Sequence, residues 1–74
     1  MIPLKPLHPD SSLSQSKLAQ YAKLSTAELL LSLYPGQPGA LKVKPNGTMM
    51  DGHHRIKILR VRGINVDTLP REII

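Results

Sequence analysis

Five consecutive residues, Asp51, Gly52, His53, His54 and Arg55, carry the side chains with the most chemistry in this chain. The segment places a carboxylate, two imidazoles and a guanidinium beside a glycine. Imidazole and guanidinium groups are directed hydrogen-bond donors, and a glycine lets a ligand come close to the backbone. This combination suits an oxyanion such as phosphate. It indicates a kind of ligand and leaves open whether a reaction follows.

The segment lies where a strand is expected to end and a helix to begin. If the helix starts near His53, its unpaired amides and the positive end of its dipole favour an anion. Arg55 would add a bidentate contact to phosphate, and one imidazole would donate a hydrogen bond or act as a general acid. Asp51 would orient an imidazole, hold a metal-bound water or cap the helix. In a purely structural alternative, Asp51 is the cap, Gly52 makes the turn and His54 packs into the fold.

The adjacent histidines His53 and His54 are poorly spaced for a metal ion. Side chains of neighbouring helical residues point about 100° apart, so they rarely share one ion. Helical metal sites use histidines four positions apart, a spacing that this segment lacks. We therefore predict no metal site formed by these residues with Asp51, even with His8 as a remote third ligand.

Positive charge is concentrated in the second half of the chain. The whole chain has ten Lys and Arg against five Asp and Glu, a net charge of +5. Residues 42–74 hold seven of the basic and three of the acidic residues, a net of +4, and residues 1–41 hold the remaining +1. This asymmetry favours a phosphorylated ligand or a polyanionic partner, and the alternative is that basic surface residues only keep a small domain soluble.

A nucleic acid is the alternative partner that this charge allows. The candidate contacts to its backbone are Lys42, Lys44, Arg60 and Arg62. A His–Asp pair in the same half would then serve metal-assisted hydrolysis. Tyr21 and Tyr34 are the only aromatic residues besides histidine, and neither lies in the basic half, which argues against binding of single strands by stacking.

The length of 74 residues predicts a single domain over residues 1–74. A domain of this size buries only about 60% of the surface of its unfolded chain, so a homodimer or a larger partner protein is a further possibility. A non-catalytic subunit of that kind would expose apolar surface at residues 29–33 or 69–74. The chain has no cysteine and no apolar run of about 20 residues, so we expect a cytoplasmic protein without a membrane partner.

Two helices are expected in the first half, after a proline-rich extended arm over residues 2–9. The first helix should run from about residue 14 to 23. The second should begin at Ser25 with a capping box to Glu28, and should stop before Pro35. Their expected buried residues are Leu18, Tyr21 and Ala22 on the first helix and Leu29, Leu30, Leu31 and Leu33 on the second.

The second half is expected to form a hairpin, a helix and a strand. Residues 41–44 alternate apolar and basic side chains, Pro45-Asn46-Gly47 marks a tight turn, and residues 49 and 50 open the return strand. Residues 53–62 fit a strand in part, but Gly63 behind a cationic last turn favours a helix. Residues 69–74 resemble a final strand. The order extended–α–α–β–turn–β–α–β is an α+β fold.

Three stretches resemble parts of the ParB/sulfiredoxin-like superfamily, and together they cover most of the chain. Residues 2–9, Ile-Pro-Leu-Lys-Pro-Leu-His-Pro, look like the opening strand and turn of ParB amino-terminal domains. Residues 24–33 look like the helix that follows. Residues 43–58 look like the hairpin, the Gly-x-x-Arg turn and its helix.

The resemblance implies a small α+β domain with a nucleotide-phosphate site, in which Gly52, His54 and Arg55 match the phosphate-binding turn. Members of the superfamily act as nucleotide-gated DNA clamps, reduce sulfinic acids with ATP or phosphorylate free serine. His53 stands where sulfiredoxins place their catalytic cysteine, which excludes that reaction here. The resemblance therefore implies ATP or another nucleotide with magnesium as the cofactor, and a nucleotide or phosphorylated small molecule as the partner.

Overall fold

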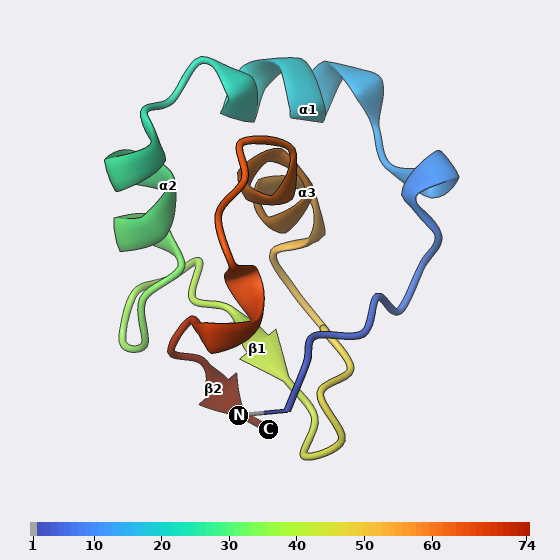
Figure 1. Cartoon of the computed structure of the whole chain (residues 1–74), viewed down its shortest axis with the longest axis vertical. Helices are drawn as coiled ribbons and strands as arrows, with labels where there is room; N and C mark the ends of the chain where they lie inside the picture. Colours follow the sequence, from blue (N-terminus) through green and yellow to red (C-terminus); the bar gives the residue numbers. More distant parts are fainter. Residues whose placement is uncertain (1) are drawn as a thin grey trace.

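The computed structural model describes residues 2–74, apart from the side chain of Asp10. In chain order the elements are η1 (Asp10–Ser12), α1 (Gln15–Ala22), α2 (Thr26–Ser32), β1 (Lys42–Val43), α3 (His53–Val61), η2 (Val66–Thr68) and β2 (Glu72–Ile73). The described residues thus form three α-helices and a two-stranded parallel sheet (Figure 1). The expected α+β class is confirmed.

Side chains cap both helices of the first half where the sequence predicts their starts. The Ser14 hydroxyl accepts the amide of Lys17 at the start of α1. At the start of α2 the Ser25 hydroxyl accepts the Glu28 amide at 3.1 Å, and the Glu28 carboxylate accepts the Ser25 amide at 3.0 Å. This reciprocal pair satisfies two amides that the helix leaves unpaired, which explains why α2 begins there.

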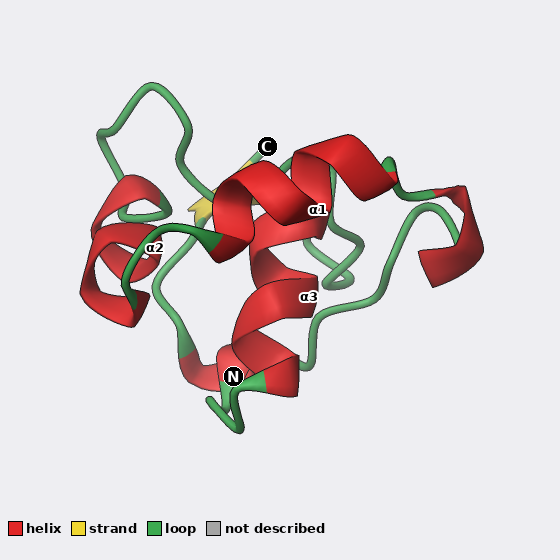
Figure 2. Ribbon diagram, turned by 90° about the horizontal axis from the view of Figure 1, so that it is seen from above, coloured by secondary structure: helices red, strands yellow, loops and turns green. Residues whose placement is uncertain are grey.

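Helix α3 lies between α1 and the sheet and passes under α1 (Figures 1 and 2). Its carboxyl end confirms the prediction from Gly63, which has φ +84°. The amide of Gly63 donates to the Arg60 carbonyl, and the amide of Ile64 donates to the Leu59 carbonyl. These bonds close the last turn of the helix, and they require a left-handed residue that glycine provides without strain.

The sheet differs in detail from the expected hairpin of two strands. The turn is present, because Gly47 donates to the Lys44 carbonyl and Lys44 donates to the Thr48 carbonyl, both at 2.9 Å. Met49, however, pairs with Val43 only through an isolated antiparallel bridge. The continuous partner of β1 is the final strand β2, which runs parallel to it and so confirms a strand within residues 69–74.

The proline-rich arm is extended, as predicted, and is held at both of its edges. Lys5 forms a parallel bridge with Thr48 of the hairpin. The Leu4 amide donates to the Asp67 carboxylate at 3.0 Å, and the Arg71 guanidinium donates to the Ile2 carbonyl at 2.8 Å. Ile2 and Leu4 are therefore fixed by residues more than 60 positions further along the chain.

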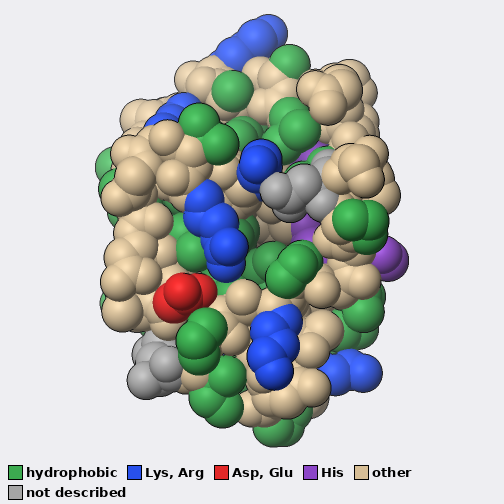
Figure 3. Space-filling view, turned by 45° about the vertical axis from the view of Figure 1, so that its right-hand side comes forward, with side chains coloured by type: hydrophobic (Ala, Val, Ile, Leu, Met, Phe, Trp, Pro, Cys, Tyr) green, Lys and Arg blue, Asp and Glu red, His purple; other side chains and the backbone are tan. Residues whose placement is uncertain are grey.

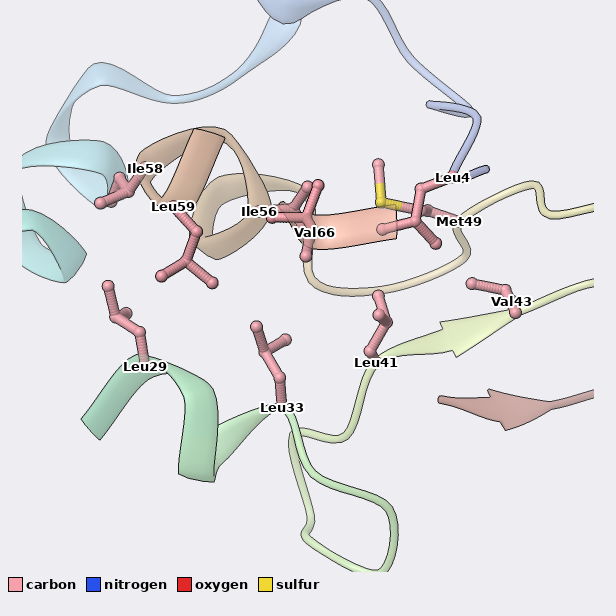
Figure 4. Close-up of a cluster of buried hydrophobic side chains, with 10 residues drawn as sticks. All are labelled: Leu4, Leu29, Leu33, Leu41, Val43, Met49, Ile56, Ile58, Leu59 and Val66. Atoms are coloured by element: carbon pink, nitrogen blue, oxygen red, sulfur yellow. The ribbon is translucent and has the colours of Figure 1, made fainter. Parts of the chain in front are cut away.

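The hydrophobic core joins α2, α3, the hairpin and the arm (Figure 4). Its fully buried side chains include Leu29, Leu41, Ile56 and Leu59. Two expected core residues lie outside it. Ala22 is exposed, because α1 is held by partly buried residues and covers α3 from the surface.

Leu31 is the second exception, with 67% of its surface exposed. Leu29 and Leu33 are four residues apart and share the buried face of α2, whereas Leu31 lies between them in sequence and projects about 160° away. One face of a helix can bury only some of a run of consecutive leucines. The others must be exposed.

Candidate functional site

A cavity of about 270 Å³ lies at the amino end of α3. All five residues of the predicted motif line it, together with side chains from the arm, η1 and α1. The other lining residues are His8, Ser12, Leu13, Lys17, Tyr21 and Met50. The structure therefore brings residues 51–55 to one hollow, with α1 and the arm as its opposite walls.

Gly52 ends the turn in a left-handed conformation, with φ +94°, and is the residue that precedes α3. A Cβ at this position would lie 3.1 Å from Leu33 Cδ2 and 3.4 Å from Leu41 Cδ1. Glycine is thus explained by the backbone angle and by close packing on the core. A side chain here would face the two leucines and Arg55 Nη2, which lies 3.8 Å from the built Cβ, and access of a ligand to the Gly52 backbone stays a prediction.

Asp51 does not cap α3, contrary to one of the expected roles. The residue at the cap position is Gly52, which offers no side-chain hydrogen bond. The Asp51 carboxylate instead accepts the amide of Gly52 at 2.8 Å. The helix therefore keeps the amides of its first turn without a side-chain cap, and the residues that carry these amides line the cavity.

The two histidines are hydrogen-bond acceptors in this structure. His53 Nε2 accepts the Leu7 amide at 3.2 Å, and His54 Nε2 accepts the Ser14 amide at 3.1 Å. A backbone N–H can only donate, so each Nε2 holds a lone pair and the proton of the neutral ring lies on Nδ1. Neither ring is oriented by the Asp51 carboxylate, which is bonded to Gly52.

The surroundings of both rings favour this neutral form. Burial lowers the pKa of His53, and positive charge on His8 and His54 lowers it further, while Asp51 acts in the opposite direction. Burial also lowers the pKa of His54, with a second contribution from Lys17. The rings of His8 and His53 are 5.6 Å apart, close enough for their charges to repel when both are protonated.

Arg55 is buried, with 7% of its surface exposed. Its Nη1 donates to the carbonyl of Ser32 at 3.2 Å and to the Ser32 hydroxyl at 3.1 Å, at the end of α2. The guanidinium carbon lies 5.8 Å from the centre of the Tyr21 ring, which is within range of a cation–π contact. The guanidinium is therefore a fixed positive charge on the wall of the cavity, not a flexible surface group.

Lys17 and Tyr21 are wall residues that the sequence analysis did not select. They lie four positions apart on α1 and therefore on the same helix face. This spacing places an ammonium and a ring side by side, but nothing near them in the sequence pairs them with residues 51–55. Only the packing of α1 on α3 shows that they belong to the same hollow.

The four basic residues named for nucleic-acid contact have different surroundings. Arg62 donates to the carbonyls of Ala22 and Leu24 and to the Thr26 hydroxyl, and Arg60 pairs with Asp67 at 3.6 Å. Lys42 is half-buried in β1 and Lys44 is exposed after it. Figure 3 shows Lys and Arg side chains spread over one face, with histidine visible between them. On that face the basic side chains do not gather into one continuous patch.

Neither a metal-ion cluster nor a membrane-spanning helix is found in the part of the chain that the structure describes. Within this described part of the chain, no group of three His, Cys, Asp or Glu side chains could hold a metal ion. None of the helices formed by these residues is long and apolar enough to cross a membrane. Comparison with models of protein families, with curated proteins and with solved structures found no match for this chain.

Proposed function

We propose that this chain binds a phosphorylated ligand, a nucleotide being the first candidate, in the cavity at the amino end of α3. The observation that carries the proposal is the guanidinium of Arg55, which is buried at the wall of that cavity and forms no ion pair with a carboxylate that the structure describes. A buried charge is unfavourable unless an opposite charge or several hydrogen bonds compensate it.

The described carboxylates are all engaged away from Arg55. Glu28 caps α2, Asp67 pairs with Arg60, and Glu72 accepts the amide of Gly36. Asp51 lines the same cavity, but its carboxylate accepts the amide of Gly52. The partners of the Arg55 guanidinium that the structure describes are all neutral: the carbonyl and hydroxyl of Ser32 and the ring of Tyr21. An anion in the cavity would supply the missing negative charge.

Two further groups of donors face the same space. The first-turn amides of α3 have no side-chain cap, and the positive end of the helix dipole adds to their attraction for an anion. Lys17 contributes an ammonium from α1. Among the lining residues, Arg55 and Lys17 carry positive charge and Asp51 carries negative charge. The charge of these three side chains therefore sums to +1 while the histidines are neutral.

The cavity volume and its walls favour a ligand larger than a bare ion. About 270 Å³ is near the lower end of small-molecule sites. Tyr21, Leu13 and Met50 provide apolar wall beside the cationic part, which suits the ring system of a nucleotide. The resemblance of residues 52–55 to the phosphate-binding turn of the ParB/sulfiredoxin-like superfamily supports phosphate over other anions. Any magnesium would then be held mainly by the phosphates of the ligand.

Binding is favoured over catalysis by the state of the imidazoles. Each Nε2 already accepts a backbone amide, so neither atom is open to take a proton from a bound ligand in this arrangement. The donors that remain include the fixed cations, the helix amides and the Nδ1–H of each imidazole. These stabilise a bound charge without providing an obvious nucleophile or base.

A titration followed by NMR tests the proposal. Inorganic phosphate, ATP and ATP with magnesium are added at constant ionic strength, and the amide signals of His53, His54 and Arg55 are followed. We expect saturable shifts at these amides and at Lys17, with tighter binding of ATP than of phosphate. Equal shifts with sodium chloride, or no shift with any of the three, would show that the cavity is not a phosphate site.

A further inference from the structure

The segment that connects the arm to α1 runs along one wall of the cavity and is tied down at its two ends by the two histidines. We call this segment, residues 7–14, the strap. His53 accepts the amide of Leu7 at one end, and His54 accepts the amide of Ser14 at the other. In Figure 1 the strap is part of the blue segment that climbs from the hairpin side to α1. Two consecutive residues of α3 thus fix both ends of one loop.

The strap also forms part of the cavity wall. His8, Ser12 and Leu13 line the hollow from this side. Most strap side chains that the structure describes are exposed, and Leu7 is 46% exposed. Little apolar burial therefore holds the strap, and its position depends strongly on the hydrogen bonds at its ends.

We infer that His53 and His54 form a proton-operated latch: as neutral acceptors they hold the strap across the cavity, and their protonation releases it. An imidazolium carries a proton on both nitrogens, so its Nε2–H would face the N–H of Leu7 or Ser14. Two donors cannot share a hydrogen bond. The ring and the amide separate, and the strap loses an attachment.

The groups around each ring set the direction of this switch. His53 faces His8 of the strap and Asp51 of the turn, and it shares a second, smaller hollow with Lys57 and Arg60. All of these except Asp51 oppose a positive ring when they are charged. The described neighbours therefore keep the latch closed at neutral pH.

His54 has a similar environment. It faces Lys17 and the ring of Tyr21, 6.4 Å away on α1, and it is followed by the cationic Arg55. Burial and these charges resist protonation. Once acid overcomes that resistance, the released imidazoliums add to the positive charge of the cavity and should bind an anion more strongly. This consequence for binding rests on the proposed function, whereas the latch itself acts in the free protein.

Hydrogen exchange of the free protein tests the latch directly. Protection of the Leu7 and Ser14 amides is measured between about pH 8 and pH 5, together with the ¹⁵N signals of the two rings. We expect protection at both amides to fall at least tenfold as the rings titrate, while Leu29 and Leu59 stay protected. Unchanged protection after both rings have titrated, or rings that stay neutral over this range, would overturn the inference.

Glutamine variants separate the hydrogen bond from other effects of pH. In His53→Gln and His54→Gln the amide oxygen can accept near the place of Nε2 but does not titrate. We expect the amide opposite each variant to keep its protection at every pH. His8→Gln is the control, since it removes a neighbouring imidazole that holds neither end of the strap. The latch would be contradicted if the fall in amide protection at low pH disappeared in His8→Gln but persisted in both His53→Gln and His54→Gln.

Sulfate distinguishes the latch from the proposed function, because its charge stays constant in this range. We expect sulfate to bind at least fivefold more tightly near pH 5.5 than near pH 7.5, a difference of about 1 kcal/mol. Equal affinity at both pH values, with a closed strap, would overturn the inference and leave the proposed site standing. An opening strap without sulfate binding at either pH would instead overturn the proposed function and its coupling to the strap.

Discussion

The guanidinium of Arg55 lies against the last turn of α2, with Nη1 3.2 Å from the carbonyl oxygen of Ser32 and 3.1 Å from its hydroxyl. These two bonds join the first turn of α3 to the end of α2. They also fix the position of the buried positive charge. The same side chain therefore has a structural task and, in our proposal, a ligand-binding task, and the two can be separated by experiment.

Arg55→Met removes the charge and both hydrogen bonds while keeping a long side chain. We expect the free energy of unfolding to fall by about 1–3 kcal/mol, because the acceptors on Ser32 lose their donor. We also expect phosphate to lose its stabilising effect on the variant. Thermal unfolding with and without phosphate measures both quantities.

Arg62→Met is the matched control for this variant. Arg62 also donates to backbone carbonyls, those of Ala22 and Leu24, at 3.1 and 2.9 Å, but it does not line the cavity. We expect a loss of stability of the same order and a full response to phosphate. If both arginine variants lost the response equally, Arg55 would have no specific part in binding.

Gly39→Ala should displace Arg55, although Gly39 itself does not line the cavity. A Cβ at Gly39 would lie 2.9 Å from Nη1 of Arg55, and Gly39 has no positive φ that would strain alanine. The guanidinium must move, so we expect phosphate affinity to fall roughly tenfold, or about 1.4 kcal/mol. Calorimetric titration gives the affinity.

Gly36→Ala provides the comparison for Gly39. Gly36 has φ +91° and no atom within 4 Å of a built Cβ, so alanine there causes backbone strain without a clash. We expect a loss of about 1–2 kcal/mol in stability and an unchanged affinity. A lower affinity in Gly36→Ala would mean that affinity merely follows stability.

Asp51→Asn should strengthen phosphate binding. The carboxylate is the opposing charge among the described walls of the cavity, and an asparagine oxygen can still accept the amide of Gly52. Removing one opposed charge near a protein surface is worth about 1 kcal/mol, so we expect affinity to rise about fivefold at low salt. A weaker affinity in this variant would instead assign Asp51 a direct role in holding the ligand.

Stability should decrease as the pH falls below the ordinary pKa of histidine, about 6.5. The folded state lowers the pKa of His53 and His54, so the unfolded chain binds protons first. Their contribution is complete above that value, declines as the pH falls toward the lowered pKa values, and is constant below them. Urea midpoints measured down to about pH 5 should show the decline, and the double variant His53→Gln, His54→Gln should flatten it.

The range of this measurement avoids a second titration. The pKa of Glu28 is lowered by its hydrogen bonds with the amide and the hydroxyl of Ser25. The stability from this capping box is present above the ordinary pKa of glutamate, about 4.3, and is lost as the pH falls through the lowered value. A decline between pH 7 and pH 5 that persisted in the double variant would not come from the two histidines.

Leu59→Ala should be among the most damaging core changes, because Leu59 is fully buried at the centre of the core. Such a truncation costs about 2–5 kcal/mol, a large share of the stability of so small a domain. Val61→Ala on the same helix is the control, since Val61 is 75% exposed and should change stability by less than about 0.5 kcal/mol. Chemical denaturation of both variants compares them.

Local signals in the sequence predicted the helices well. The Ser25 and Glu28 pair marks the start of α2, and Gly63 marks the end of α3, because each effect involves residues within one turn of a helix. The Pro45-Asn46-Gly47 turn was also found. The parallel pairing of β1 with β2 was not, since thirty residues separate the paired positions Lys42 and Glu72 and two-residue strands leave almost no pattern.

The sequence predicted where residues 51–55 stand relative to the helix start, but not the contacts that they make. Residue types placed residues 51–55 at a helix start, and they do line one cavity. The sequence did not show that His53 and His54 accept amides of Leu7 and Ser14, because these partners are 46 and 40 positions away. Nor did it show that Arg55 is buried, since its partner Ser32 belongs to another helix. Long-range packing decides both.

The attachment of the arm to the end of the chain has a consequence for the order of folding during synthesis. Leu4 is bonded to Asp67 and Ile2 to Arg71, so the arm waits for partners that lie 63 and 69 positions further along the chain. A ribosome-bound chain in which Asp67 and Arg71 have not yet emerged can form α1 and α2, but the arm lacks these partners. We therefore expect the wall that the arm contributes to the cavity to be completed only after the carboxyl-terminal segment has emerged.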